Sequence, residues 1–307
     1  MKRPRSNARV KKRFKRIYVE ISNICNIQCS FCPIVERPKE IMSLEHYQKI
    51  LNQMIPLTDD ICLHLMGEPL AHPKISEIMQ QTSESGGKVQ ITTNGLLIQK
   101  LGKMLLAQGS LRQINFSLQA FKDNFPDRPI SGYLDPIIEF TKECFIHRPD
   151  VYINYRMWNF GDKSFKENKE LITYLEEKLR WNNLNSKVDV AHIKSKKVFK
   201  DRKLYLHFDS RFEWPSAHFP IRSERGTCLG LRNHFGIHAD GSLVPCCLDK
   251  EAVITLGNVF EDSIESIIDS DRAVSMREGF ERGELVDDLC KRCTFIQRFD
   301  SKLKENN

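Results

Sequence analysis

The chain has 307 residues, of which 40% are hydrophobic and 28% are charged, so it can bury a large core and is neither a disordered nor a fibrous protein. No apolar run reaches the roughly 18 residues that a membrane-spanning helix needs, and no apolar stretch follows the basic N-terminus to make a secretory signal. The formal net charge of +7 comes from residues 1–16, which contain nine Lys and Arg and no acidic residue, so the rest of the chain has a net charge of −2.

Residues 1–15 form a basic tail in front of a nearly neutral body. Such a tail can bind a polyanion, such as RNA or an acidic peptide, or it can be a solvated arm. We expect the solvated arm, because the tail has no aromatic residue besides Phe14 and the body has no basic stripe. The sequence therefore predicts neither a nucleic-acid partner nor a membrane partner.

Short β-rich runs alternate with helical segments from residue 16 to residue 193. Strands are predicted over residues 16–22, 60–66, 88–92, 112–118, 151–157 and 187–193. Helices are predicted over residues 43–55, 74–83, 96–108, 136–147 and 165–179. Six such repeats indicate an α/β fold with parallel strands and right-handed crossovers, either an open doubly wound sheet or a barrel. In both architectures the functional residues lie at the carboxyl ends of the strands.

The pattern changes after residue 193. Residues 194–225 are rich in basic and aromatic residues and are expected to be an irregular linker, followed by a small cysteine-rich domain over residues 226–307. In that domain Asp240 and Gly241 predict a hairpin turn, and Asp262 with Glu265 predicts the start of a helix.

Cysteine usage is unusual for a chain without an export signal. The ten cysteines fall mainly into an N-terminal group and a C-terminal group. We expect a cytoplasmic, reducing environment, in which clustered cysteines indicate metal binding or redox chemistry and not disulfides. Cys62 and Cys144 lie in apolar segments and are expected to be core residues.

The first group follows the first predicted strand directly. Cys25, Cys29 and Cys32 have the spacing Cys-x3-Cys-x2-Cys, which can hold three corners of an iron–sulfur cube and leave one iron open, as in a reactive site. With an aromatic residue, Phe31, before the third cysteine, the motif resembles that of the radical S-adenosylmethionine enzymes. The resemblance implies a partial (β/α)6 TIM-type barrel over residues 16–193 and a 4Fe–4S cluster whose fourth iron is chelated by S-adenosylmethionine.

Further positions resemble this family. The resemblance implies cofactor contacts at Phe31, Gly67, Glu68, Pro69, Thr93, Asn94, Ser117 and Arg156. Residues 67–69 are similar to a family turn that binds the amino group of the cofactor, and Ser117 stands where a polar residue touches its ribose. The guanidinium fork of Arg156 suits the cofactor carboxylate. For Ser117 and Arg156 an ordinary structural role stays open.

The C-terminal group resembles an auxiliary-cluster region called SPASM, in its shorter "twitch" form. By motif position its ligands are Cys228, Cys246, Cys290 and Cys293. Four thiolates imply a second, auxiliary 4Fe–4S cluster, although the same spacing also permits a zinc site. Cys247 is then spare, and its adjacency leaves the choice between Cys246 and Cys247 open.

The resemblance implies an enzyme that reductively cleaves S-adenosylmethionine to a 5′-deoxyadenosyl radical, which removes hydrogen from a substrate. We expect a net oxidation of a small molecule, with the auxiliary cluster as electron acceptor and a flavodoxin- or ferredoxin-type protein as reductant. One alternative is a maturase that modifies a ribosomally made peptide. Another is a non-catalytic iron–sulfur or zinc scaffold. No catalytic residue is assigned from the sequence.

Overall fold

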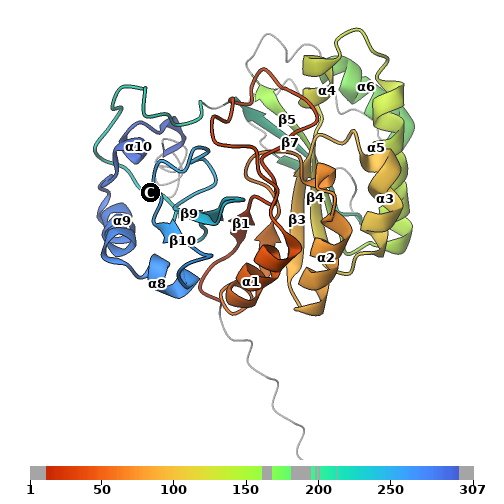
Figure 1. Cartoon of the computed structure of the whole chain (residues 1–307). Helices are drawn as coiled ribbons and strands as arrows, with labels where there is room; N and C mark the ends of the chain where they lie inside the picture. Colours follow the sequence, from red (N-terminus) through yellow and green to blue (C-terminus); the bar gives the residue numbers. More distant parts are fainter. Residues whose placement is uncertain are drawn as a thin grey trace, which may run out of the picture.

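The structure is a computed structural model that describes residues 12–160, 168–180, 195–197, 199, 201–211 and 213–296. A single ten-stranded sheet runs through this part of the chain in the order β10-β9-β8-β1-β2-β3-β4-β5-β7-β6 (Figure 1). Six neighbouring strands pair in parallel, namely β1 (Ile17–Val19), β2 (Asp60–Cys62), β3 (Lys88–Thr93), β4 (Leu111–Ser117), β5 (Tyr152–Phe160) and β7 (Leu204–Ser210). The predicted α/β partial barrel is thereby confirmed.

The sixth parallel strand of the described sheet, β7, lies where no strand was predicted. The predicted strand over residues 187–193 lies outside the described residues, whereas β7 forms within the segment that we expected to be an irregular linker. Its Leu204, Leu206 and Phe208 are buried and alternate with more exposed residues, which is the period of a strand. The basic and aromatic composition of the surrounding segment concealed this alternation. β6 (Ser195–Lys197) pairs with β7 in the antiparallel sense.

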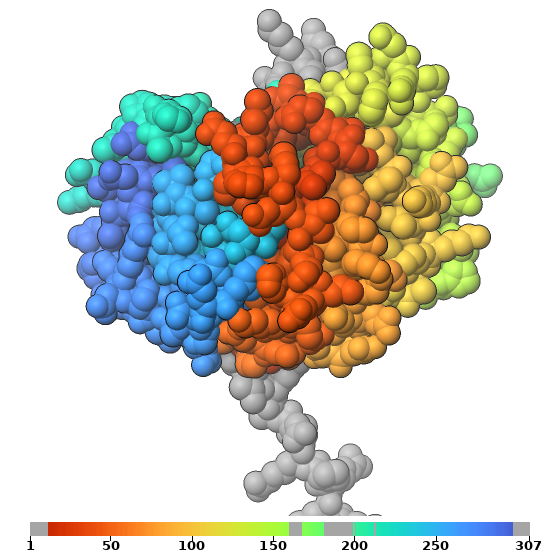
Figure 2. All heavy atoms as spheres, in the orientation of Figure 1, coloured from red at the N-terminus to blue at the C-terminus, as the bar shows by residue number. Residues whose placement is uncertain are grey.

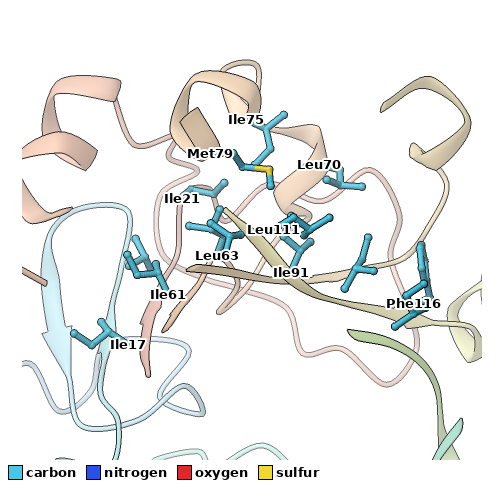
Figure 3. Close-up of a cluster of buried hydrophobic side chains, with 14 of the residues drawn as sticks. Ile17, Ile21, Ile61, Leu63, Leu70, Ile75, Met79, Ile91, Leu111 and Phe116 are labelled. Carbon is cyan, nitrogen blue, oxygen red and sulfur yellow. The ribbon is translucent and has the colours of Figure 1, made fainter. Parts of the chain in front are cut away.

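Helices connect the parallel strands and cover their outer face. The five predicted helices are present within a few residues of their expected bounds, as α1 (Leu44–Met54), α2 (Ile75–Glu84), α3 (Ile98–Ala107), α5 (Ser131–His147) and α6 (Asn168–Leu179). Figure 3 shows Ile75 and Met79 of α2 lying over Leu63, which follows β2, and Ile91 of β3, and all four side chains are buried. The core therefore lies between the outer face of the sheet and the helices. The side chains on the inner face of the sheet point into the barrel and can form a site.

Shorter elements complete this half of the chain. A 3-10 turn, η1 (Pro69–Ala71), follows β2, and a short helix, α4 (Gln119–Asn124), follows β4. Neither was predicted from the periodicity. No helix of the described residues has the length and apolar character that crossing a bilayer would require.

The C-terminal region continues the same sheet. β8 (Gly236–Ile237) pairs in parallel with β1, and β9 (Ser242–Val244) and β10 (Gly257–Asn258) extend the sheet in the antiparallel sense. The predicted turn is confirmed, with Gly241 at a φ of 86°. Figure 2 shows the C-terminal segment, in blue, lying directly beside the N-terminal segment, in red.

Helices α8 (Ile264–Ile268), α9 (Asp271–Arg282) and α10 (Asp288–Lys291) follow, and η3 (Thr294–Ile296) ends the described chain. The predicted cap at Asp262 is wrong. Ser263 is the N-cap of α8, because its hydroxyl accepts a hydrogen bond from the backbone N–H of Ser266 at 3.1 Å.

A buried ion pair ties the two regions together. The Glu20 carboxylate, just after β1, lies 3.0 Å from Nη2 of Arg37 and 3.3 Å from Nδ1 of His238. The backbone N–H of Ala239 also donates to it, at 3.3 Å. Because Glu20 and His238 are fully buried, this contact fixes the C-terminal hairpin against the first strand of the barrel.

Candidate active site

The first cysteine loop lies at the carboxyl end of β1. Asn124 Nδ2 donates to the Cys29 thiol at 3.2 Å, and Asn94 Nδ2 lies 3.9 Å from the Cys25 thiol. Burial raises the pKa of Cys29 to about 12 and that of Cys32 to about 11. The thiols are therefore neutral until a metal replaces their protons. Three such thiols with amide donors to sulfur fit a cluster bound by thiolates.

Two residues of α4 hold this loop from the neighbouring side of the barrel. The Asp123 carboxylate accepts hydrogen bonds from the backbone N–H and the hydroxyl of Ser30, and the Asn124 side-chain oxygen accepts from the backbone N–H of Gln28 at 3.1 Å. Sequence reasoning missed both residues. The only signal available was their position shortly after the fourth strand, at the carboxyl edge of the sheet.

The turn after β2 packs directly against the same loop. Gly67 has a φ of +75°, and a Cβ there would lie 2.3 Å from the carbonyl oxygen of Ser22, so no larger residue fits. The Glu68 carboxylate accepts from the backbone N–H groups of Leu70 at 3.0 Å and Asn94 at 2.7 Å. Burial raises the pKa of Glu68 to about 7 although these donors oppose the shift.

Several predicted cofactor positions thus form one unit beside the cysteine loop. Pro69 begins η1 directly after Glu68, and the Thr93 hydroxyl accepts from the backbone N–H of Gly95 at 3.0 Å. Asn94 joins the turn to the loop, since its side chain also donates to Asn26 at 2.7 Å. This unit presents a buried carboxylate beside the Cys25 end of the cysteine loop.

The other predicted cofactor positions lie in a separate cavity inside the barrel. Phe31, Ser117 and Arg156 line this cavity, which has a volume of about 340 Å³ and which we call the lumen cavity. Cys32 also lines it, so it borders the first cysteine loop. Cys62, expected to be a core residue, is buried as predicted but faces the lumen cavity, whereas Cys144 is buried in α5.

The inner wall of the barrel is polar. The Thr92 hydroxyl lies 3.1 Å from His64 Nε2, and it accepts from Asn115 Nδ2 at 3.1 Å and from Arg156 Nη1 at 3.3 Å. Asn154 Nδ2 donates to the Asn115 side-chain oxygen at 2.8 Å. The interior of a closed (β/α)8 barrel is usually filled by branched apolar residues, so this polar wall indicates a binding site.

The C-terminal cysteines surround a second cavity of about 150 Å³. It is lined by Cys228, Cys246, Cys247, Cys290 and Cys293 among others. Burial raises the pKa of Cys246 and of Cys290 well above that of a free thiol. In the part of the chain that the structure describes, no three His, Cys, Asp or Glu side chains converge on a single-ion position, and these thiols instead enclose a space.

A shared wall separates the two cavities. Tyr18, Cys247 and Leu248 line both of them, whereas Cys246 lines only the second. The peptide bond between Cys246 and Cys247 therefore connects the two sites. The sequence did not reveal this wall, because Tyr18 and Cys247 are more than 200 residues apart and meet only through the pairing of β8 with β1.

The two regions that contain the cysteine sites each match a known protein family. Residues 19–175 match the radical SAM superfamily, and residues 228–294 match SPASM, an iron–sulfur cluster-binding domain. The chain belongs to the radical SAM superfamily and carries a C-terminal SPASM domain. Its cofactors are S-adenosylmethionine and 4Fe–4S clusters.

Individual relatives differ in what they do. The chain is 28% identical over 141 residues to GTP 3′,8-cyclase of Alkaliphilus oremlandii. The aligned region covers 43% of this chain and 44% of the cyclase, so the likeness spans less than half of that enzyme. It is 24% identical over 273 residues to the antilisterial bacteriocin subtilosin biosynthesis protein AlbA of Bacillus subtilis, covering 82% of this chain and 58% of AlbA. Among solved structures, Streptococcus suis SuiB bound to its precursor peptide SuiA has a similar fold, with a TM-score of 0.58 and 16% identity over 94% of this chain and 73% of SuiB.

Proposed function

We propose that this protein is a radical SAM enzyme that oxidises a small molecule bound in the lumen cavity. One observation carries the proposal: the lumen cavity is bordered by Cys32 of the first cysteine loop and by Cys247 beside the second cysteine site. A substrate in it would lie between a radical-forming site and an electron acceptor. A volume of about 340 Å³ also falls in the usual size range of small-molecule sites.

Each cofactor has a set of residues suited to hold it. We assign the first cluster to Cys25, Cys29 and Cys32, and the methionyl end of S-adenosylmethionine to the unit formed by residues 67–69, Thr93 and Asn94. The second cluster is assigned to Cys228, Cys246, Cys290 and Cys293. The choice of Cys246 is supported by its position, since it lines only the second cavity whereas Cys247 also faces the lumen cavity.

When bound, these cofactors supply a 5′-deoxyadenosyl radical that removes a substrate hydrogen, and an acceptor for the electron that the substrate radical then releases. The chain orients them. Asn124 directs an N–H group at the sulfur of Cys29, and Glu68 places a buried carboxylate where an ammonium group would find its charge partner. Phe31 and Trp158 in the cavity wall help to exclude water from the reaction.

A peptide substrate is the second candidate. The likeness to AlbA extends over most of this chain, and SuiB was solved with a precursor peptide bound. In that case the lumen cavity would hold one side chain of the peptide while the rest of it lay outside. Deuterium transfer from labelled candidates into 5′-deoxyadenosine separates the two, because only the true substrate delivers its hydrogen.

The class of reaction is tested with anaerobically reconstituted protein, dithionite and S-adenosylmethionine. We expect 5′-deoxyadenosine from the wild type, none from Cys29→Ala, and an unchanged yield from Cys144→Ala, whose thiol is also buried but lines neither cavity. Zinc in place of iron and sulfide, with no 5′-deoxyadenosine, would establish a scaffold and refute the enzyme.

A further inference from the structure

We propose that the lumen cavity recognises its substrate through an anionic group, a carboxylate or a phosphate monoester, that binds between Arg16 and Arg156. This rests on the proposed function, in which the lumen cavity is the substrate site. It adds the chemical class of the substrate, which neither the family nor its relatives specify for this chain.

The charge of the cavity wall is the first observation. The described residues that line it include Arg16, Arg156 and Arg211, and no Asp or Glu. Arg211 lies 4.0 Å from Asp123, so part of its charge is balanced. Among the residues that the structure describes, no carboxylate forms an ion pair with Arg16 or with Arg156. The cavity thus holds about two uncompensated positive charges.

Asp60 acts on the charge of Arg16, but its carboxylate already has other partners. Asp60, at the start of β2, contributes to raising the pKa of Arg16, but its oxygens accept from Arg112 Nη1 at 3.1 Å and Gln90 Nε2 at 3.2 Å. Asp60 itself does not line the cavity. An incoming anion is therefore needed to balance the guanidinium groups.

The second observation is that Arg156 has unused hydrogen-bonding capacity. Among the described residues its Nη1 reaches the Thr92 hydroxyl alone, at 3.3 Å, and its guanidinium lies over the Trp158 ring at 4.5 Å. Its Nε is buried and has no hydrogen-bond partner among the described residues, whereas the unpaired side-chain oxygen of Gln119 in the same wall is an acceptor that suits a donor group of the substrate and not the anion itself. A buried donor on a cation is costly to leave unpaired, so these groups await a ligand.

The neighbouring imidazoles respond to this positive field. Burial, with the charges of Arg156 and Arg16, lowers the pKa of His64 to about 3, and burial with Arg16 lowers that of His234 to about 4. Both rings are neutral near pH 7. His64 lines the lumen cavity and can donate or accept a hydrogen bond with the substrate, whereas His234 lines the second cavity. Neither ring supplies a counter-charge.

The geometry favours a substrate anion over the carboxylate of S-adenosylmethionine. The residues assigned to the methionyl end of the cofactor, among them Glu68 and Asn94, do not line the lumen cavity. Arg16 precedes β1, whereas the first cysteine loop follows that strand, so Arg16 lies at the opposite end of it. Arg156 shares the lumen cavity with Tyr18 and Cys247, which also line the second cavity, so it faces the wall next to the second cysteine site. We therefore assign Arg156 to the substrate and not to the cofactor.

The test measures binding to the reconstituted holoenzyme, saturated with S-adenosylmethionine so that no probe can enter the cofactor site. Isothermal titration calorimetry compares phenylacetate and phenyl phosphate with the neutral phenylacetamide. We expect one anion or both to bind at least about 10-fold more tightly than the amide, because hydrogen bonds to charged groups are the strong ones. The preferred anion identifies the substrate group as carboxylate or phosphate.

Substitutions show which arginines bind the anion. R16Q and R156Q should each weaken anion binding roughly 10- to 100-fold and leave the amide unchanged. R282Q is the matched control, because Arg282 is exposed on α9 and, within the part of the chain that the structure describes, pairs with Glu278 and Glu284 alone. Its anion affinity should equal that of the wild type.

Three results would overturn the proposal: equal binding of amide and anions, equal losses in R282Q, or a loss of cofactor affinity in R156Q at least as large as its loss of anion affinity. If R16Q or R156Q fails to fold, the wild-type comparison of anion and amide still decides. Formation of 5′-deoxyadenosine without substrate tests the proposed function independently, since it requires no anion.

Discussion

The buried Glu20 carboxylate offers the sharpest test of how the barrel and the SPASM region are held together. In Glu20→Gln the side chain keeps its shape but loses its charge, while Arg37 and His238 stay behind. Removing one partner of a buried ion pair typically costs about 3–5 kcal/mol, because the remaining charge is left uncompensated. We expect about 3 kcal/mol here, since the amide oxygen can still accept one of the hydrogen bonds.

The pH dependence has a defined sign. Burial alone would raise the pKa of Glu20, but the hydrogen bond and charge of His238, followed by those of Arg37, hold it below the ordinary value of 4.5. The stabilisation is therefore fully present above pH 4.5 and is lost as the pH falls through the lower pKa of the folded state. Glu20→Gln should lack this part of the acid transition.

The assay is calorimetric and chemical unfolding of the holoprotein. A loss of about 3 kcal/mol corresponds to a melting temperature roughly 5 °C below that of the wild type. The control is Glu284→Gln, whose ion pair with Arg282 at 3.2 Å is exposed, and it should change stability by less than about 1 kcal/mol. Equal stability of wild type and Glu20→Gln above pH 5 would refute the reasoning.

Two further predictions concern the first cysteine loop. Gly67→Ala should destabilise the protein by more than about 2 kcal/mol and lower its iron and sulfide content, because the new Cβ would meet the Ser22 carbonyl. The control is Gly86→Ala, where φ is +77° but the space around the residue is open. It should cost only about 1 kcal/mol and leave the iron and sulfide content unchanged. Asn124→Ala removes the N–H group that lies 3.2 Å from the Cys29 sulfur, so the reduction potential of that cluster should become more negative in an EPR-monitored redox titration; an unchanged potential would show that this contact does not tune the cluster.

Much of the fold follows from local patterns. The alternation of β-rich runs and amphipathic helices predicted five of the six parallel strands of the barrel and the five longer helices that connect them, because strand and helix periodicities leave a clear imprint on the sequence. β7 was missed since its alternation lies in a basic, aromatic segment, and the cap of α8 was displaced by one residue because Asp262 and Ser263 are both good capping residues.

The sequence by itself indicated iron–sulfur chemistry, through its cysteine spacing and its resemblance to the radical S-adenosylmethionine enzymes, because iron–sulfur ligation needs thiolates at short, regular separations that the chain carries in its primary structure. Only the tertiary structure decided where a substrate can lie. The pairing of β8 with β1 brings Cys247 against Tyr18, and the inward face of the barrel gathers Arg16 and Arg156 around one cavity. Such contacts join residues far apart in the chain, so no local pattern records them.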